Sequence, residues 1–148
     1  MSVINREGIL ALVPHQQGMC LWDAVLEWDD ARIVLQADSH RDAANPLRGD
    51  GRLHALHLCE YGAQAMAVHG GLLARDQGAA PRPGMLVALR GVQLHADRID
   101  TLPGPLRGEA RVVARSADSQ QYAFTIRHHD QLLAVGRAAV MLGPLPGT

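Results

Sequence analysis

The amino-acid sequence predicts an α+β protein in which one long, buried helix is wrapped by a curved antiparallel β-sheet. The first observation is the segment 53–76, which has no proline and is apolar around most of its helical circumference; such a helix is a buried one. The second is the alternation of apolar and polar residues in segments after residue 84, which is typical of strands with one solvated face. In a chain this short, a sheet is the expected wrapping for one buried helix.

Length and charge limit the classes of protein to consider. A chain of 148 residues is expected to form a single domain, 1–148, with a core of useful size. The formal net charge is -1 and 20% of the residues are charged. No electrostatic field strong enough to attract nucleic acid or an anionic membrane is therefore expected.

The sequence carries no signal for export. Cys20 and Cys59 lie far apart without a Cys-x-x-Cys pair, so a reduced compartment is expected. The segment 1–10 lacks the layout of a signal peptide, and no apolar run reaches membrane length. We therefore expect a cytoplasmic protein without a membrane segment, in which Cys59 is a small core residue.

The elements can be placed in order from local signals. Asn5 is expected to cap a short helix, 6–13, that Pro14 helps to end. Two runs joined by Asp29 and Asp30 predict a hairpin, and 39–52 has the composition of a loop. The expected strands are 20–28 and 32–38 before the long helix 53–76, then 85–95, 106–116, a run around Tyr122 to Ile126, and 132–142. A long apolar helix wrapped by such a sheet is the hot-dog fold.

Polar residues on the long helix point to chemistry. At about 100° per residue, His57, Glu60, Tyr61 and Gln64 fall on one face. A buried carboxylate needs a partner or a raised pKa, and a carboxyl with an imidazole one turn away is a candidate acid/base pair. The alternative is that Glu60 is a partly solvated helix residue that bridges to an Arg or a His.

Two stretches resemble a known family. The segment 12–23, Leu-Val-Pro-His-Gln-Gln-Gly-Met-Cys-Leu-Trp-Asp, resembles a Leu-Pro-His-x-x-Pro-Met/Phe-Leu-Leu-x-Asp opening motif. The segment 60–67, Glu-Tyr-Gly-Ala-Gln-Ala-Met-Ala, resembles a Glu-x-Met-Ala-Gln helix motif. Both belong to the hot-dog 3-hydroxyacyl-(acyl carrier protein) dehydratases, and the resemblance is nearest to the branch associated with aryl-polyene synthesis.

The resemblance implies loss of water from a 3-hydroxyacyl thioester on the phosphopantetheine of an acyl carrier protein, in fatty-acid or aryl-polyene-type synthesis. It implies no metal or redox cofactor, and a homodimer or a mixed hot-dog dimer. Glu60 matches the family's helix acid and Gln64 its helix glutamine. The family's loop histidine is absent, because Asn-Pro-Leu-Arg stands at 45–48. His57 or His15 is the candidate base in its place, ahead of other histidines at 40 and 54.

The remaining candidate residues concern binding. Tyr61 and Asn45 are expected near the substrate, and Arg90 is expected to help to hold the phosphopantetheine arm or its carrier. Arginines at 41, 48 and 52 in the loop are either solvated or part of that docking site. The spacing His-x-x-His-x-x-Glu over 54–60 lacks the i, i+4 histidines of a zincin helix, so no metal is expected.

Two other functions stay open. A hot-dog thioesterase would use Glu60 to activate water against the same thioester. A non-catalytic acyl-binding subunit would instead complete the site of a partner dehydratase. The missing loop histidine favours both alternatives.

Overall fold

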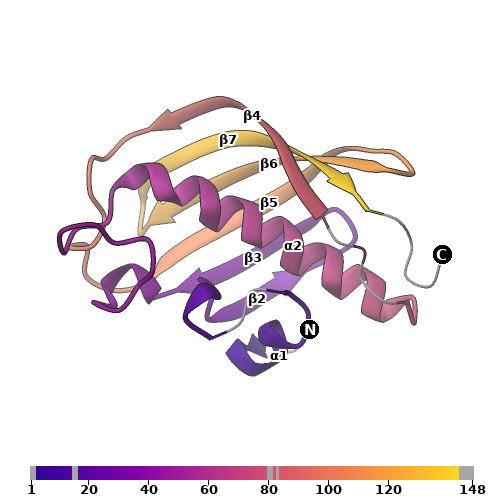
Figure 1. Ribbon diagram of the computed structural model, residues 1–148, viewed down its shortest axis with the longest axis horizontal. Coiled ribbons are helices and arrows are strands. Elements are labelled where there is room, and N and C mark those ends of the chain that lie inside the picture. The colour runs from indigo at the N-terminus through magenta and orange to yellow at the C-terminus, as the bar shows by residue number, and fades with distance from the viewer. Residues whose placement is uncertain (1–2, 15–16, 80–81, 83, 144–148) are drawn as a thin grey trace.

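The computed structural model describes residues 3–14, 17–79, 82 and 84–143, and shows one long helix in the concave face of a curved sheet (Figure 1). The sheet order is β1-β2-β3-β5-β6-β7-β4, and each neighbouring pair is antiparallel. The elements are β1 (Ile4–Asn5), α1 (Arg6–Leu10), η1 (Gln17–Met19), β2 (Ala24–Trp28), β3 (Arg32–Ala37), η2 (Ser39–Arg41), η3 (Ala55–His57), α2 (Leu58–Asp76), β4 (Gly84–Leu94), β5 (Leu106–Arg115), β6 (Ser119–His128) and β7 (Gln131–Leu142). The predicted α+β architecture is confirmed.

The N-terminal helix is shorter than predicted. Asn5 caps it as expected, because its side-chain oxygen accepts a hydrogen bond of 3.0 Å from the N–H of Gly8. The helix ends at Leu10 rather than near residue 13 because the N–H of Leu12 turns back to the carbonyl of Ile9, at 2.9 Å. The short strand β1, which pairs with β2, was not predicted.

The predicted hairpin is β2 and β3, and Asp29 forms its turn. The Asp29 carboxylate accepts hydrogen bonds from the N–H groups of Ala31, at 2.8 Å, and Arg32, at 2.9 Å. These two bonds hold the carboxylate charged and lower the pKa of Asp29. The turn therefore takes its shape from one side chain.

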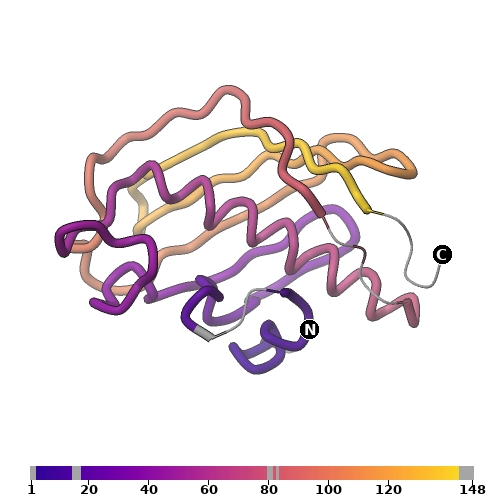
Figure 2. The backbone as a smooth tube through the Cα atoms, viewed as in Figure 1, coloured from indigo at the N-terminus to yellow at the C-terminus, as the bar shows by residue number. Residues whose placement is uncertain are grey.

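The long helix begins later than predicted. Residues 55–57 form a 3₁₀ turn, and α2 runs from Leu58 to Asp76. The N–H of Leu53 is bound by Asp100 at 2.9 Å and the N–H of Ala55 by the carbonyl of Asp97 at 2.8 Å. The entry to the helix is therefore tied to the connection between β4 and β5, as the backbone trace shows (Figure 2).

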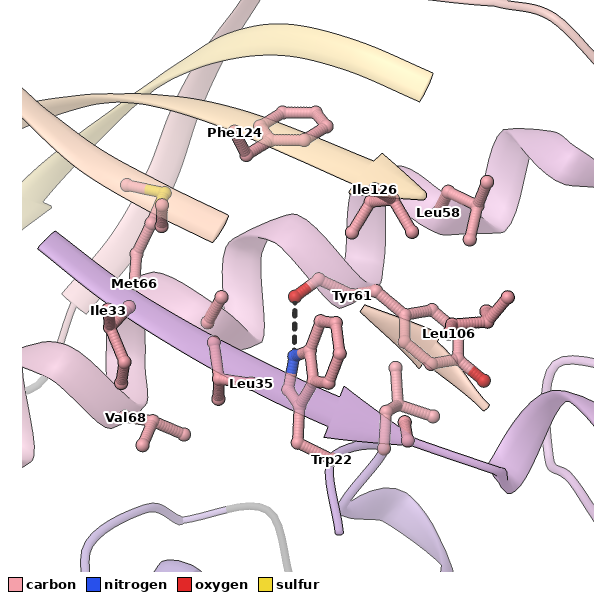
Figure 3. Packing of buried hydrophobic residues seen from close by; sticks show 14 of the residues in the cluster. Trp22, Ile33, Leu35, Leu58, Tyr61, Met66, Val68, Leu106, Phe124 and Ile126 are labelled. Carbon is pink, nitrogen blue, oxygen red and sulfur yellow. Dashed lines mark hydrogen bonds between the residues drawn. The ribbon is translucent and has the colours of Figure 1, made fainter. Parts of the chain in front are cut away.

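The core lies between α2 and the sheet (Figure 3). Gly62 lets the helix approach β6, since a Cβ at this position would lie 2.7 Å from the ring of Phe124. Trp22 is fully buried in the same core. Its ring meets the ring of Tyr61 edge to face, with 5.5 Å between the two centroids. Register shifts in β2, β4, β5 and β6 add local twist, which helps the sheet to curve around the helix.

Candidate active site

His57 and Glu60 stand at the start of α2. His57 Nδ1 lies 3.1 Å from Glu60 Oε1, within hydrogen-bond distance. The 3₁₀ turn before the helix places the imidazole here, and Glu60 lies in the first turn of α2, where the helix dipole favours negative charge. The structure therefore brings the predicted acid/base pair together.

The expectation that Glu60 is buried was wrong for the single chain. Its side chain is 52% exposed and that of His57 is 31% exposed, whereas Tyr61 and Gln64 are buried. The buried part of this face is covered by two segments: Gln64 bonds to Met19 and Leu21 of the opening segment. Tyr61 bonds to Ser39 and Asn45 of the loop after β3. The arrangement matches the alternative that Glu60 is a partly solvated residue bridging to a histidine.

The hydroxyl of Tyr61 belongs to a buried chain of hydrogen bonds. Ser39 donates its hydroxyl proton to the carbonyl of Leu21 at 2.6 Å, so Tyr61 must donate to Ser39 across 2.8 Å. Asn45 donates to the Tyr61 oxygen at 3.2 Å. Burial raises the pKa of Tyr61 and keeps the phenol neutral.

Asn45 stands where the resemblance places the loop histidine, and its amide is fully used by the protein. Besides Tyr61, it donates to the carbonyl of Ser39 at 2.9 Å and accepts from the N–H of Leu47 at 2.9 Å. The side chain therefore fixes the loop 39–47 against α2. The sequence did not reveal the part that Ser39 takes in this contact.

Gln64 joins the two stretches that carry the family resemblance. Its side-chain oxygen accepts from the N–H of Leu21 at 2.9 Å, and its nitrogen donates to the carbonyl of Met19 at 2.7 Å. The indole N–H of Trp22 donates to the carbonyl of Tyr61 at 2.8 Å. These three contacts hold the opening segment on the helix.

The other histidines take several places. His40 is buried and its Nε2–H donates to the carbonyl of Leu102 at 3.0 Å; burial lowers its pKa and favours the neutral ring. His54 is exposed, and its Nδ1 accepts from the N–H of Leu56 at 2.9 Å, which caps the 3₁₀ turn. His15 lies outside the described residues.

Arg48 and Arg90 lie in different settings from those expected. The Arg48 guanidinium donates to the carbonyls of Gly51, at 2.8 Å, and His40, at 3.1 Å, and lies 4.0 Å from Asp100. It is thus used to hold the loop. Arg90 is exposed and opposite Arg137 in the register of β4 and β7, on the face of the sheet away from α2.

A polar hollow of about 640 Å³ lies on the other side of the Tyr61 network. Its lining includes Arg6, Cys20, Asp23, Ser39 and Asn45. Neither His57 nor Glu60 lines it. In the single chain, the acid/base pair therefore lies outside this hollow and is partly exposed to solvent.

Among the described residues, no three His, Cys, Asp or Glu side chains come together in a group that could hold a metal ion. None of the helices in the described part of the chain is long and apolar enough to cross a bilayer.

The fold defines a hot-dog protein. A structure of the dehydratase heterocomplex ApeI:P from Xenorhabdus doucetiae matches with a TM-score of 0.81 at 20% identity, over 92% of this chain and 91% of that chain. AziG from S. sahachiroi matches with a TM-score of 0.59 at 19% identity, over 82% and 90% of the two chains. A variant of the thioesterase PA1618 from Pseudomonas aeruginosa matches with a TM-score of 0.60 at 11% identity, over 82% and 81%.

The chain belongs to the ApeP-like family. The model of this family, described as ApeP dehydratase, matches residues 8–144. The family resemblance predicted from the two motifs is therefore confirmed, and the protein is a member of a dehydratase family. No curated protein matches the sequence.

Proposed function

We propose that this protein takes part in the dehydration of 3-hydroxyacyl thioesters on an acyl carrier protein to trans-2-enoyl thioesters, in fatty-acid or aryl-polyene-type synthesis. The observation that carries the proposal is the His57–Glu60 contact of 3.1 Å at the start of α2, in a chain of the ApeP-like dehydratase family. No metal or redox cofactor takes part.

The two side chains divide the reaction between them. The neutral imidazole of His57 takes the proton from C2 of the acyl chain as the bond between C3 and oxygen breaks. The Nδ1–H of the same ring passes its proton to the Glu60 carboxylate across their contact of 3.1 Å. Glu60 gives that proton to the leaving hydroxyl, which departs as water as the C2–C3 double bond forms.

The start of α2 supplies a further contribution. The positive end of the helix dipole lies here, where the 3₁₀ turn runs into the helix and the carbonyl of Ala55 accepts from the N–H of Leu58. A thioester carbonyl placed near this end is polarised, which makes the C2 proton more acidic. His15 remains the second candidate for the base in this proposal.

The test is a short 3-hydroxyacyl thioester, with enoyl absorbance and free thiol followed together. Enoyl product is expected from the wild type, and Glu60→Gln and His57→Ala are each expected to reduce its rate by about 100-fold or more. The controls are Glu7→Gln and His95→Ala, which change exposed residues elsewhere and are expected to retain the rate. Retained dehydration in Glu60→Gln would rule out the proposed roles.

Hydrolysis of the thioester is the second candidate reaction. The half-exposed carboxylate of Glu60 has access to water, and a thioesterase is among the proteins that share the fold. Release of free thiol without enoyl product, lost in Glu60→Gln, would support this function in place of dehydration.

A partner subunit is also part of the proposal. Among the described strands, β4 lies at an edge of the sheet and has β7 as its one neighbour. Its side chains of Met85 and Val87 are 68% and 52% exposed, and Leu86 and Leu89 are also exposed. A long apolar edge strand is a template for pairing with another chain, and we place the partner subunit along this strand.

The partner is a second copy or a different hot-dog subunit. The name of the Xenorhabdus doucetiae heterocomplex supports a mixed pair, as does the absence of the family's loop histidine here. Sedimentation of the pure chain should show a dimer if it pairs with itself, and Val87→Asp should then give monomers. A folded wild-type monomer that gains dehydratase activity only with a second subunit would support the mixed pair and the non-catalytic alternative.

A further inference from the structure

The face of the sheet away from α2, here called the outer face, is rich in arginine. Along each strand, alternate residues such as Ile33, Ala110 and Phe124 are buried against the helix. The residues between them point outward. The outward arginines are Arg32 on β3, Arg107 and Arg111 on β5, Arg127 on β6, Arg137 on β7 and Arg90 on β4. Glu109 is the one carboxylate that the described strands β3 to β7 place among them.

Three pairs of these arginines stand directly opposite each other in the strand register. They are Arg32 and Arg111, Arg107 and Arg127, and Arg90 and Arg137. Like charges directly opposite on neighbouring strands destabilise a sheet. Folding alone therefore does not account for this arrangement.

Only one of the three pairs is balanced by nearby carboxylates. Glu109 binds Arg111 at 2.9 Å and Arg32 at 3.4 Å, and Arg32 also pairs with Glu27 at 2.7 Å. Arg107 and Arg127 are exposed and form no ion pair within the described part of the chain. Their repulsion remains in the isolated protein.

A hollow lies between these two arginines. It has a volume of about 170 Å³ and is lined by Val34, Arg107, Gly108, Glu109, Thr125 and Arg127. Guanidinium groups bind a carboxylate through parallel N–H donors, and the Thr125 hydroxyl adds a further donor. The carboxylate of Glu109 is already bound to Arg32 and Arg111. Arg107 and Arg127 therefore remain available to an anion from another molecule.

We propose that the outer face docks an acidic protein partner, with a carboxylate of that partner held between Arg107 and Arg127. A protein surface fits better than a nucleic acid for two reasons. The described strands place no aromatic side chain on this face on which bases would stack, and the chain as a whole has a net charge of -1. Arginine is instead among the residues that are enriched at protein interfaces.

The test is the binding of a fluorescein-labelled polyglutamate peptide at low salt, measured by anisotropy. Arg107→Gln/Arg127→Gln is expected to weaken binding by about tenfold or more. Arg75→Gln/Arg115→Gln removes the same charge from exposed positions that are not among the outer-face arginines and serves as the matched control. Equal weakening in both double variants would overturn the proposal, and so would tighter binding of an oligothymidine of the same length.

A second measurement separates docking from folding. If Arg107 and Arg127 repel each other, Arg107→Gln should leave the urea midpoint unchanged or raise it, while it weakens peptide binding. A lowered midpoint would show that the arginine stabilises the fold, and the proposal would fail. Docking at this face does not depend on the reaction proposed for His57 and Glu60, so turnover of a small thioester should be the same in this variant as in the wild type.

Discussion

The side-chain oxygen of Gln64 accepts a hydrogen bond of 2.9 Å from the backbone N–H of Leu21. The same amide donates to the carbonyl of Met19 at 2.7 Å. One side chain of the long helix thus satisfies two backbone groups of the opening segment. Leu21 and Gln64 are 43 residues apart in the sequence. Both stretches of the family resemblance therefore act as one structural unit.

Gln64→Leu should destabilise the protein by about 2–4 kcal/mol, because it leaves the N–H of Leu21 and the carbonyl of Met19 without their partner. The free energy of unfolding in urea measures the loss. Gln77→Leu, at an exposed position after the same helix, should change it by less than about 0.5 kcal/mol. Similar losses in the two variants would contradict the role of Gln64 in holding the opening segment on the helix.

Two glycines of α2 give a matched pair for the packing of the helix. A Cβ at Gly62 would lie 2.7 Å from the ring of Phe124, whereas one at Gly70 meets nothing within 4 Å. Gly62→Ala should therefore cost about 1–3 kcal/mol through overpacking. Gly70→Ala should stabilise by about 0.4–1 kcal/mol, because alanine loses less backbone entropy in a helix. Thermal unfolding of both variants checks the pair, and a stabilising Gly62→Ala would mean that the helix is not held this close to β6.

Asp100 connects the loop before the helix to the one before β5. Its carboxylate accepts from the N–H of Leu53 at 2.9 Å and pairs with Arg98, and these contacts hold its pKa well below the usual range. Asp100→Asn should cost about 1–3 kcal/mol, because it removes the charge from the hydrogen bonds that Arg98 and Leu53 donate. Asp130→Asn, in the turn between β6 and β7, is the control. The readout is urea unfolding at neutral pH, and equal stability of the two variants would count against the connection.

The sequence revealed the fold more fully than the site. Apolar residues around most of 58–72 and the alternation in 106–112 depend on burial, which local pattern reports directly. The exposure of Glu60 depends on which segments reach the first turn of the helix, and no local pattern carries that information. The same is true of Arg48, which looked free in a polar loop and is bound to backbone carbonyls of that loop.

Contacts between distant segments were also missed. Nothing near Ser39 indicates that it accepts from Tyr61, 22 residues further on. Nothing near His128 indicates that it is buried with its Nε2–H donated to the carbonyl of Pro103. The like-charge pairs of the outer face depend on strand register, and sequence alternation predicts which residues face outward but not which ones meet.

His69 should make the protein less stable in mild acid. The ring is buried, with one nitrogen 2.7 Å from the carbonyl of Asp29 and the other 2.6 Å from the hydroxyl of Tyr122. Because a carbonyl only accepts, Nε2 carries the proton and Nδ1 accepts from the phenol, whose own pKa burial raises to about 12. Burial lowers the pKa of His69, and a second proton would remove the acceptor that Tyr122 uses.

The sign of the effect follows from this lowered pKa. The unfolded chain binds a proton at His69 below a pH of about 6.5, whereas the folded chain does so only at lower pH. The stabilising effect of the neutral ring is therefore complete above that pH and is lost as the pH falls. Buried His40 adds to the slope in the same direction. The free energy of unfolding in urea, measured from pH 7.5 to pH 5, should fall in the wild type and in the control His95→Gln. His69→Gln should start lower at pH 7.5 and fall less steeply. An unchanged slope in His69→Gln would mean that this ring takes up its proton equally well in the folded and unfolded chains.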